Sequence, residues 1–209
     1  MNYPDELCQL IIRNVEILET APSVRDKIER QLFATINTRI KERVEAQKGK
    51  WKGYYKKLMV GDKKDDDDTS FALDEWPEDN DVYLVYFQLG CTEDACPDDE
   101  EHSWLAFAAG YNGMALCLEF SVDLALKDLG QRLREFYKST PALHEAKFLC
   151  TKDGSIYRPF SFDAEKLAEE YPVFDVSLAP LDAALDDIFK THKEFDAFVK
   201  KLKTARRKK

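Results

Sequence analysis

The sequence predicts an α+β fold, with a small mixed or antiparallel sheet packed against N-terminal helices and a C-terminal amphipathic helix. Two β-rich apolar runs, residues 82–89 and 114–120, lie at the centre of the chain. Segments with apolar residues at helical spacing flank these runs on both sides, and no internal repeat links them. A chain of 209 residues can bury the core of one such domain without metals or disulfides.

Two helices are expected before the sheet. The first covers residues 4–19, where apolar residues recur on one face. Ser23 and Asp26 have the spacing of a capping box, which predicts that a second helix opens at Ser23. Helical spacing also predicts a core-facing stripe on the second helix, made of Ile28, Leu32, Ile36, Ile40 and Val44.

The chain after the central strands is expected to alternate helices and strands. Asp123 is a candidate cap for a helix that ends before Pro141. The Asp153-Gly154 pair between two apolar runs predicts a β-hairpin. The remaining elements are predicted to be a short helix, a strand and a long amphipathic helix, at residues 163–170, at residues 173–178 and from about Leu181 onward.

Charge defines the predicted domain organisation. The net charge is -9, and residues 62–101 carry sixteen acidic residues against only Lys63 and Lys64. The sequence therefore predicts one α+β domain over residues 1–203, with a mobile acidic insertion at residues 61–80. A basic tail is expected at residues 204–209, and the basic and aromatic segment at residues 49–60 is expected to contact the chain's own acidic residues.

Composition excludes several classes of protein. The first twenty residues mix charged and apolar side chains, which is typical of neither a signal peptide nor a membrane span. Five scattered cysteines, an odd number, indicate reduced thiols and favour a soluble protein of the cytoplasm. Cys91 and Cys96 lack a second pair at zinc spacing, so no metal is expected. Phosphate-binding and dinucleotide-binding glycine motifs are missing too, and no cofactor is predicted.

A set of motifs in residues 81–203 resembles a bacterial family, the domain-of-unknown-function family 2971. Trp104, Phe107 and Gly113 precede a strand that ends Leu118, Glu119 and Phe120, which is the order typical of that family. The later family elements are matched by Pro141, Ala142, Leu143, Glu145, the Asp153-Gly154 turn and the run Ser177, Leu178, Ala179, Pro180. The resemblance implies that a ligand-binding site lies near these motifs.

The sequence departs from the family at its polar positions. Ala146, Phe148 and Cys150 stand where the family has charged residues, so Glu145 is the only acid in that row. A carboxylate pair can divide acid and base work, and apolar replacements cannot. Residues 1–80 also lack the Asn-Asp-Pro motif of typical members. The resemblance therefore implies a copy without catalytic activity.

Two hypotheses for function follow. The first is a non-catalytic binding or regulatory module, whose acidic surface engages a basic protein or a nucleic-acid-binding protein through Asp65, Asp66, Asp67 and Asp68. The negative charge argues against direct binding of nucleic acid. The second is an enzyme acting on a nucleotide-like ligand through Glu119 and Glu145. A pocket that also holds Trp104, Tyr111 and Asn112 is expected only for the second.

Overall fold

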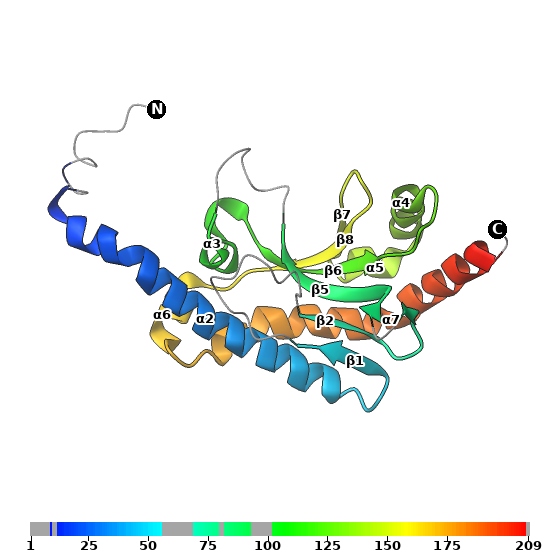
Figure 1. Cartoon of the computed structure of the whole chain (residues 1–209), viewed down its shortest axis with the longest axis horizontal. Coiled ribbons are helices and arrows are strands. Elements are labelled where there is room, and N and C mark those ends of the chain that lie inside the picture. The colour runs from blue at the N-terminus through cyan, green and yellow to red at the C-terminus, as the bar shows by residue number, and fades with distance from the viewer. Residues whose placement is uncertain (1–8, 10–11, 56–68, 80–81, 93–101, 208–209) are drawn as a thin grey trace.

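The computed structural model describes residues 9, 12–55, 69–79, 82–92 and 102–207, and it has the predicted α+β architecture (Figure 1). A six-stranded sheet, antiparallel at every pairing, forms the centre. A separate pair of short strands, β3 (Glu78–Asp79) and β4 (Val82–Tyr83), lies beside it. The order across the large sheet is β1 (Trp51–Tyr54), β2 (Ser70–Leu73), β5 (Val85–Cys91), β6 (Leu116–Val122), β8 (Ile156–Phe160) and β7 (Leu149–Cys150).

The two predicted central runs form the neighbouring strands β5 and β6. Phe87 lies opposite Phe120 in their register, and both side chains are buried. On β5, buried residues alternate with half-buried ones such as Gln88, which is the pattern of a sheet with one face on the core. The buried side, called the inner face below, is covered by the long C-terminal helix α7 (Ala179–Arg207). Phe195 of α7 contacts Phe87 and Phe120, with ring centroids 5.0 and 4.7 Å apart.

Residues 15–45 form one continuous helix, where the sequence predicted the end of one helix and the start of another. α2 (Val15–Glu45) runs through Pro22 without a break, so Ser23 is not its N-cap. Proline removes one backbone hydrogen bond, but the following turns keep theirs and gain core packing, which overrides the local stop signal. The predicted core stripe is confirmed from Leu32 onward, because Leu32, Ile36 and Ile40 are fully buried and Val44 almost so, whereas Ile28 is only half-buried.

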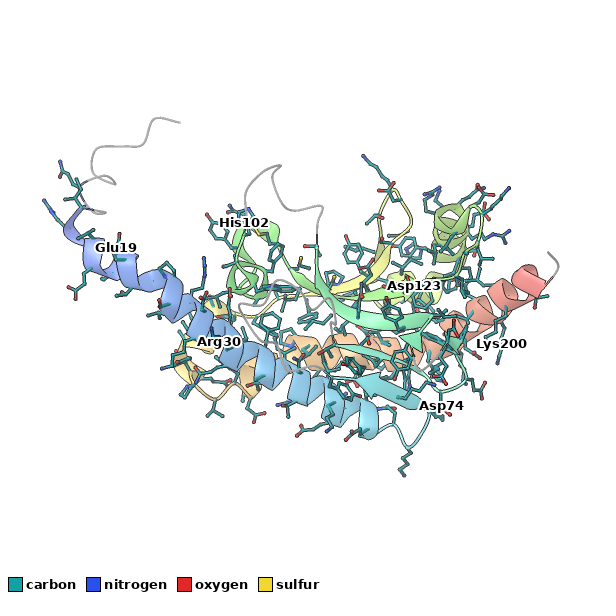
Figure 2. All side chains as sticks on the ribbon, in the orientation of Figure 1. Glu19, Arg30, Asp74, His102, Asp123 and Lys200 are labelled. Atoms are coloured by element: carbon teal, nitrogen blue, oxygen red, sulfur yellow. The ribbon has the colours of Figure 1, made fainter. Side chains whose placement is uncertain are left out.

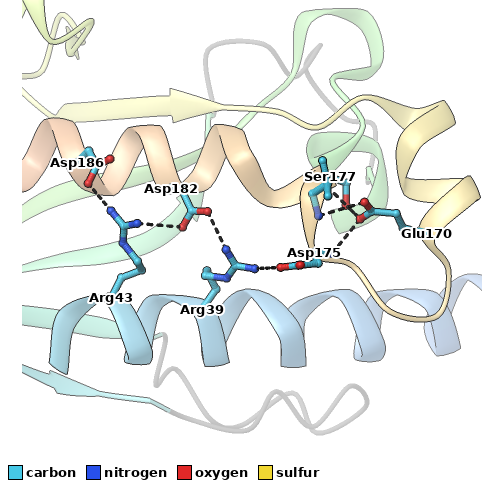
Figure 3. Close-up of polar contacts among 8 residues, drawn as sticks. Arg39, Arg43, Glu170, Asp175, Ser177, Asp182 and Asp186 are labelled. Atoms are coloured by element: carbon cyan, nitrogen blue, oxygen red, sulfur yellow. Dashed lines mark hydrogen bonds and ion pairs between the residues drawn. The ribbon is translucent and has the colours of Figure 1, made fainter. Parts of the chain in front are cut away.

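Two arginines of α2, one helical turn apart, form ion pairs with α7 (Figure 3). Arg39 donates from Nη1 to Oδ2 of Asp182 at 2.8 Å, and it also pairs with Asp175. One turn further on, Arg43 pairs with Asp186. The first and last long helices are therefore held together beneath the sheet.

The helix expected to begin at Asp123 starts later in the chain. Asp123 does not cap a helix, because its carboxylate accepts a hydrogen bond from the Tyr86 hydroxyl at 2.9 Å. The helix α4 (Leu129–Ser139) begins six residues later, and a second short helix, α5 (Pro141–Glu145), starts at the proline. The predicted hairpin is confirmed as β7 and β8.

The expected strand at residues 173–178 is not formed. The region contains a short 3-10 helix, η3 (Val176–Leu178), which follows α6 (Ala164–Glu170). Glu170 accepts hydrogen bonds from the backbone N–H groups of Asp175, Val176 and Ser177, at 2.8 to 3.0 Å. These are the groups that a strand would need for its ladder, so the carboxylate replaces a neighbouring strand. The predicted helices around this segment, α6 and α7, are confirmed.

The expected acidic insertion contains a strand of the central sheet. Phe71 of β2 is fully buried, and Trp76 is 3 % exposed. Residues 69–79 therefore contribute to the core, which corrects the prediction of a mobile insertion for this part. Residues 61–68 and residue 80 lie outside the described residues. The predicted basic tail at residues 204–209 begins within α7, which continues to Arg207.

Candidate functional site

A cavity of about 270 Å³ lies on the outer face of the sheet, opposite to α7. It is formed by the ends of β5 and β6 and by the hairpin of β7 and β8. Its described lining residues are Cys91, Thr92, Cys117, Glu119, Thr151, Asp153, Ser155 and Tyr157.

Strand register brings the polar side chains of the cavity floor together. Glu119 of β6 lies directly between Gln88 of β5 and Tyr157 of β8. These side chains share the outer face because neighbours in register point to the same side of a sheet. Gln88 donates from Nε2 to Oε2 of Glu119 at 3.4 Å, which orients the carboxylate from one side. Cys117 lies two residues before Glu119, so it shares the same face.

The turn between β7 and β8 forms one wall of the cavity. The Thr151 hydroxyl accepts hydrogen bonds from the N–H groups of Gly154 and Ser155, at 3.2 and 3.0 Å. Gly154 has φ of 105°, and a Cβ at this position would overlap the backbone of Gly130 in α4. The turn is thus held against α4 with Asp153 at its tip, and only glycine fits this contact.

The rim at the end of β5 is also fixed. Thr92 Oγ1 accepts from the N–H of Ala115 at 3.1 Å, and the Thr92 N–H donates to the Ala115 carbonyl at 2.9 Å. Together the described lining side chains offer two carboxylates, four hydroxyls and two thiols, with no lysine, arginine or histidine among them. Such a set can bind a cation or a ligand rich in hydrogen-bond donors.

Of the predicted ligand-binding residues, the structure places Glu119 in this cavity and the others elsewhere. Trp104 opens α3 (Trp104–Ala108), and its ring packs edge-on against Phe33 at 5.1 Å. Tyr111 and Asn112 lie in the exposed 3-10 turn η2 (Tyr111–Gly113). Glu145 is exposed at the end of α5. None of these four is among the described lining residues, so the structure does not assemble the expected five-residue pocket.

The expected partner-binding residues Asp65, Asp66, Asp67 and Asp68 lie outside the described residues. Acidic residues that follow them in the chain are paired with the chain's own lysines. Lys52 pairs with Glu78 and lies 3.9 Å from Asp74, as expected for the basic and aromatic segment. Lys203 of α7 donates to the backbone carbonyl of Glu75 at 2.8 Å.

Sequence reasoning missed the other lining residues of the cavity. The alternation within β6 could have placed Cys117 beside Glu119. The contribution of Tyr157 depends on the pairing of β6 with β8, which no local pattern specifies. Cys150, by contrast, is outside the described lining, and burial raises the pKa of its thiol, which disfavours the nucleophilic thiolate.

The described part of the chain contains no cluster of histidine, cysteine, aspartate or glutamate that could hold a metal ion. None of its helices combines the length and the apolar character needed to cross a membrane. No protein-family model matches the chain, and neither does any curated protein or solved structure. The resemblance to family 2971 stays a prediction.

Proposed function

We propose that this protein is a non-catalytic binding module of the cytoplasm, which recognises a lysine or arginine side chain of a basic partner protein. The observation that carries the proposal is the composition of the outer-face cavity. Glu119 and Asp153 supply two carboxylates, and no described lining residue supplies a compensating cation. A cationic side chain entering the cavity would gain charge-assisted hydrogen bonds, which are about twice as strong as neutral ones.

The size of the cavity favours a side chain over a free small molecule. Its volume of about 270 Å³ is below the range of roughly 300 to 1,000 Å³ that is typical of small-molecule sites. An arginine presents five N–H donors on a narrow, planar group, and the hydroxyls of Thr151, Ser155 and Tyr157 can accept those that the carboxylates leave.

The net charge of the chain supports the same class of partner. At -9, the protein attracts a basic protein or the basic surface of a nucleic-acid-binding protein before contact, which raises the association rate. Asp65 to Asp68 are proposed to contribute to this attraction rather than to the contact in the cavity.

The alternative function, an enzyme acting on a nucleotide-like ligand, needs Glu119 and Glu145 at one site. Glu145 is exposed on α5 and is not a described lining residue of the cavity that holds Glu119. The two carboxylates could therefore not share proton transfer there, and the binding function is the better supported of the two.

The proposal is tested by titrating the full chain with N-acetyl-arginine amide and following chemical shifts by NMR. We expect binding by the wild type, and no binding of the neutral citrulline analogue. Glu119→Gln should weaken binding at least about tenfold, because it removes a charge-assisted contact. Glu145→Gln is the matched control and should bind like the wild type.

Equal binding of the arginine and citrulline probes would contradict recognition of a cation. A loss of binding in Glu145→Gln that matches the loss in Glu119→Gln would contradict the assignment of the site. Turnover of any member of a nucleotide panel by the wild type, abolished in Glu145→Gln, would favour the enzyme instead.

A further inference from the structure

The N-terminal half of α2, residues 15–28, extends beyond the sheet (Figure 1). Val15, Ile17 and Val24 are 57 %, 64 % and 52 % exposed. Glu19 lies on the extension and Arg30 where α2 meets the rest of the fold (Figure 2). Single exposed apolar residues are ordinary, but several on one helix mark an interaction surface.

Ile17 and Val24 belong to a face of α2 that leads into a groove. Ile17, Ala21, Val24 and Ile28 are spaced by four, three and four residues, which places them on one side of the helix. Ile28 also lines an apolar groove of about 360 Å³ between α2, α3 and α6, with Leu105, Leu167 and Tyr171 among the other lining residues. The exposed face and the groove are therefore continuous.

The face is complementary to itself in the antiparallel direction. When a second copy of α2 is laid against it with the two-fold axis between residues 22 and 23, Ile17 lies opposite Ile28 of the second copy. Ala21 then lies opposite Val24 of that copy, and its small side chain allows the helices to approach closely.

The charges beside the face match the same alignment. Glu16 and Lys27 are eleven residues apart, which is close to three turns, so both flank the apolar face on the same side. In the antiparallel arrangement Glu16 of each copy lies near Lys27 of the other, and the two-fold axis generates this pair twice.

We propose that two copies of this chain associate through their α2 helices, with residues 15–28 antiparallel and Ile17 seated at the mouth of the other copy's groove. The surface fits a second copy of the chain, because the same face of α2 supplies the residues on both sides of the contact. A two-fold interface requires this self-complementarity. The association also supports a helix segment that Pro22 deprives of one hydrogen bond.

Sedimentation equilibrium of the full chain tests the proposal. We expect a reversible dimer for the wild type. Glu16→Lys and Lys27→Glu should each weaken it roughly tenfold, because two ion pairs become two like-charge contacts. An equimolar mixture of the two variants should regain wild-type affinity as a heterodimer, in which both pairs are restored. Glu19→Lys, the matched reversal on the opposite side of α2, should leave the dimer unchanged.

A second variant separates association from folding. Ile17→Asp with Val24→Asp should give a monomer with an unchanged circular dichroism spectrum, because both side chains are exposed within one copy. A wild-type monomer at all concentrations, a mixture that fails to restore association, or a dimer that survives the double substitution would each overturn the proposal.

Discussion

Arg158 of β8 reaches from the inner face of the sheet to α7, where its Nε donates to Oδ2 of Asp187 at 3.0 Å. The arginine side chain is 11 % exposed and the aspartate 21 %. It occupies a position between Ile156 and Phe160, where the strand pattern calls for an apolar residue. The pair joins the strand to the helix that covers it.

Replacing one partner of this pair should cost more stability than replacing both. Arg158→Met leaves the Asp187 charge without its partner, and we expect the free energy of unfolding to fall by about 3 kcal/mol. Arg158→Met combined with Asp187→Leu should recover part of that loss, because no uncompensated charge remains. Urea denaturation measures both, and a double variant less stable than the single one would contradict the explanation.

Glu170 should give the protein a stability that disappears in acid. Hydrogen bonds from the backbone and hydroxyl of Ser177, and from the backbone of Asp175, lower the pKa of this carboxyl to about 2 from its ordinary 4.5 (Figure 3). Since the folded pKa is the lower one, the stabilisation is complete above pH 4.5 and is lost as the pH falls toward 2.

Urea midpoints between pH 2 and pH 5 measure this effect. Glu170→Gln should flatten the pH dependence in that window and lower stability at neutral pH. Glu169→Gln, at the exposed neighbouring residue, should leave the curve unchanged. An equal change in the two variants would show that general surface charge, rather than this set of hydrogen bonds, sets the pH dependence.

Phe71→Ala should be strongly destabilising, because its ring is fully buried and stacks on Phe87 with centroids 5.7 Å apart. We expect a loss of about 3 to 5 kcal/mol, the usual cost of removing a buried aromatic side chain. Tyr54→Ala, at a side chain that is 51 % exposed, is the control and should cost much less. Thermal or urea unfolding measures both, and similar losses would mean that β2 is not a core strand in solution.

Two glycines with positive φ separate backbone strain from steric overlap. Gly113 has φ of 81° and open space around the position of a Cβ, so Gly113→Ala should cost about 1 to 2 kcal/mol from conformation alone. Gly154→Ala should cost clearly more, because its Cβ would overlap the Gly130 backbone. It should also weaken binding in the cavity, whose wall this turn forms. Equal costs would contradict the close contact.

The parts of the fold that follow from local pattern were predictable. Alternation predicted β5 and β6, and helical spacing predicted the buried stripe of α2 and the long helix α7. β2 was missed because Phe71 and Leu73 are only two alternating apolar residues, and the surrounding acidic residues dominate the composition. The expected strand at residues 173–178 failed because Glu170 bonds the backbone N–H groups that follow it.

The candidate site was predictable only in part, for a different reason. Glu119 was identified from its strand, but Tyr157 and Asp153 join it through the pairing of β6 with β8 and through the contact of Gly154 with Gly130. Such contacts join residues far apart in the chain, and a single sequence does not specify them. The family resemblance predicted one site for Glu119 and Glu145, whereas Glu145 is exposed at the end of α5.

The helix α7, which covers the inner face of the sheet, is synthesised after the strands that it covers. Phe195 of α7 contacts Phe87, Phe120 and Phe148, which all precede it in the chain. During translation the strands therefore leave the ribosome before the helix that buries their aromatic side chains. A nascent chain that stops before α7 exposes an aromatic surface, which is the kind of species that aggregates or recruits chaperones. Productive folding of the sheet is coupled to the synthesis of α7.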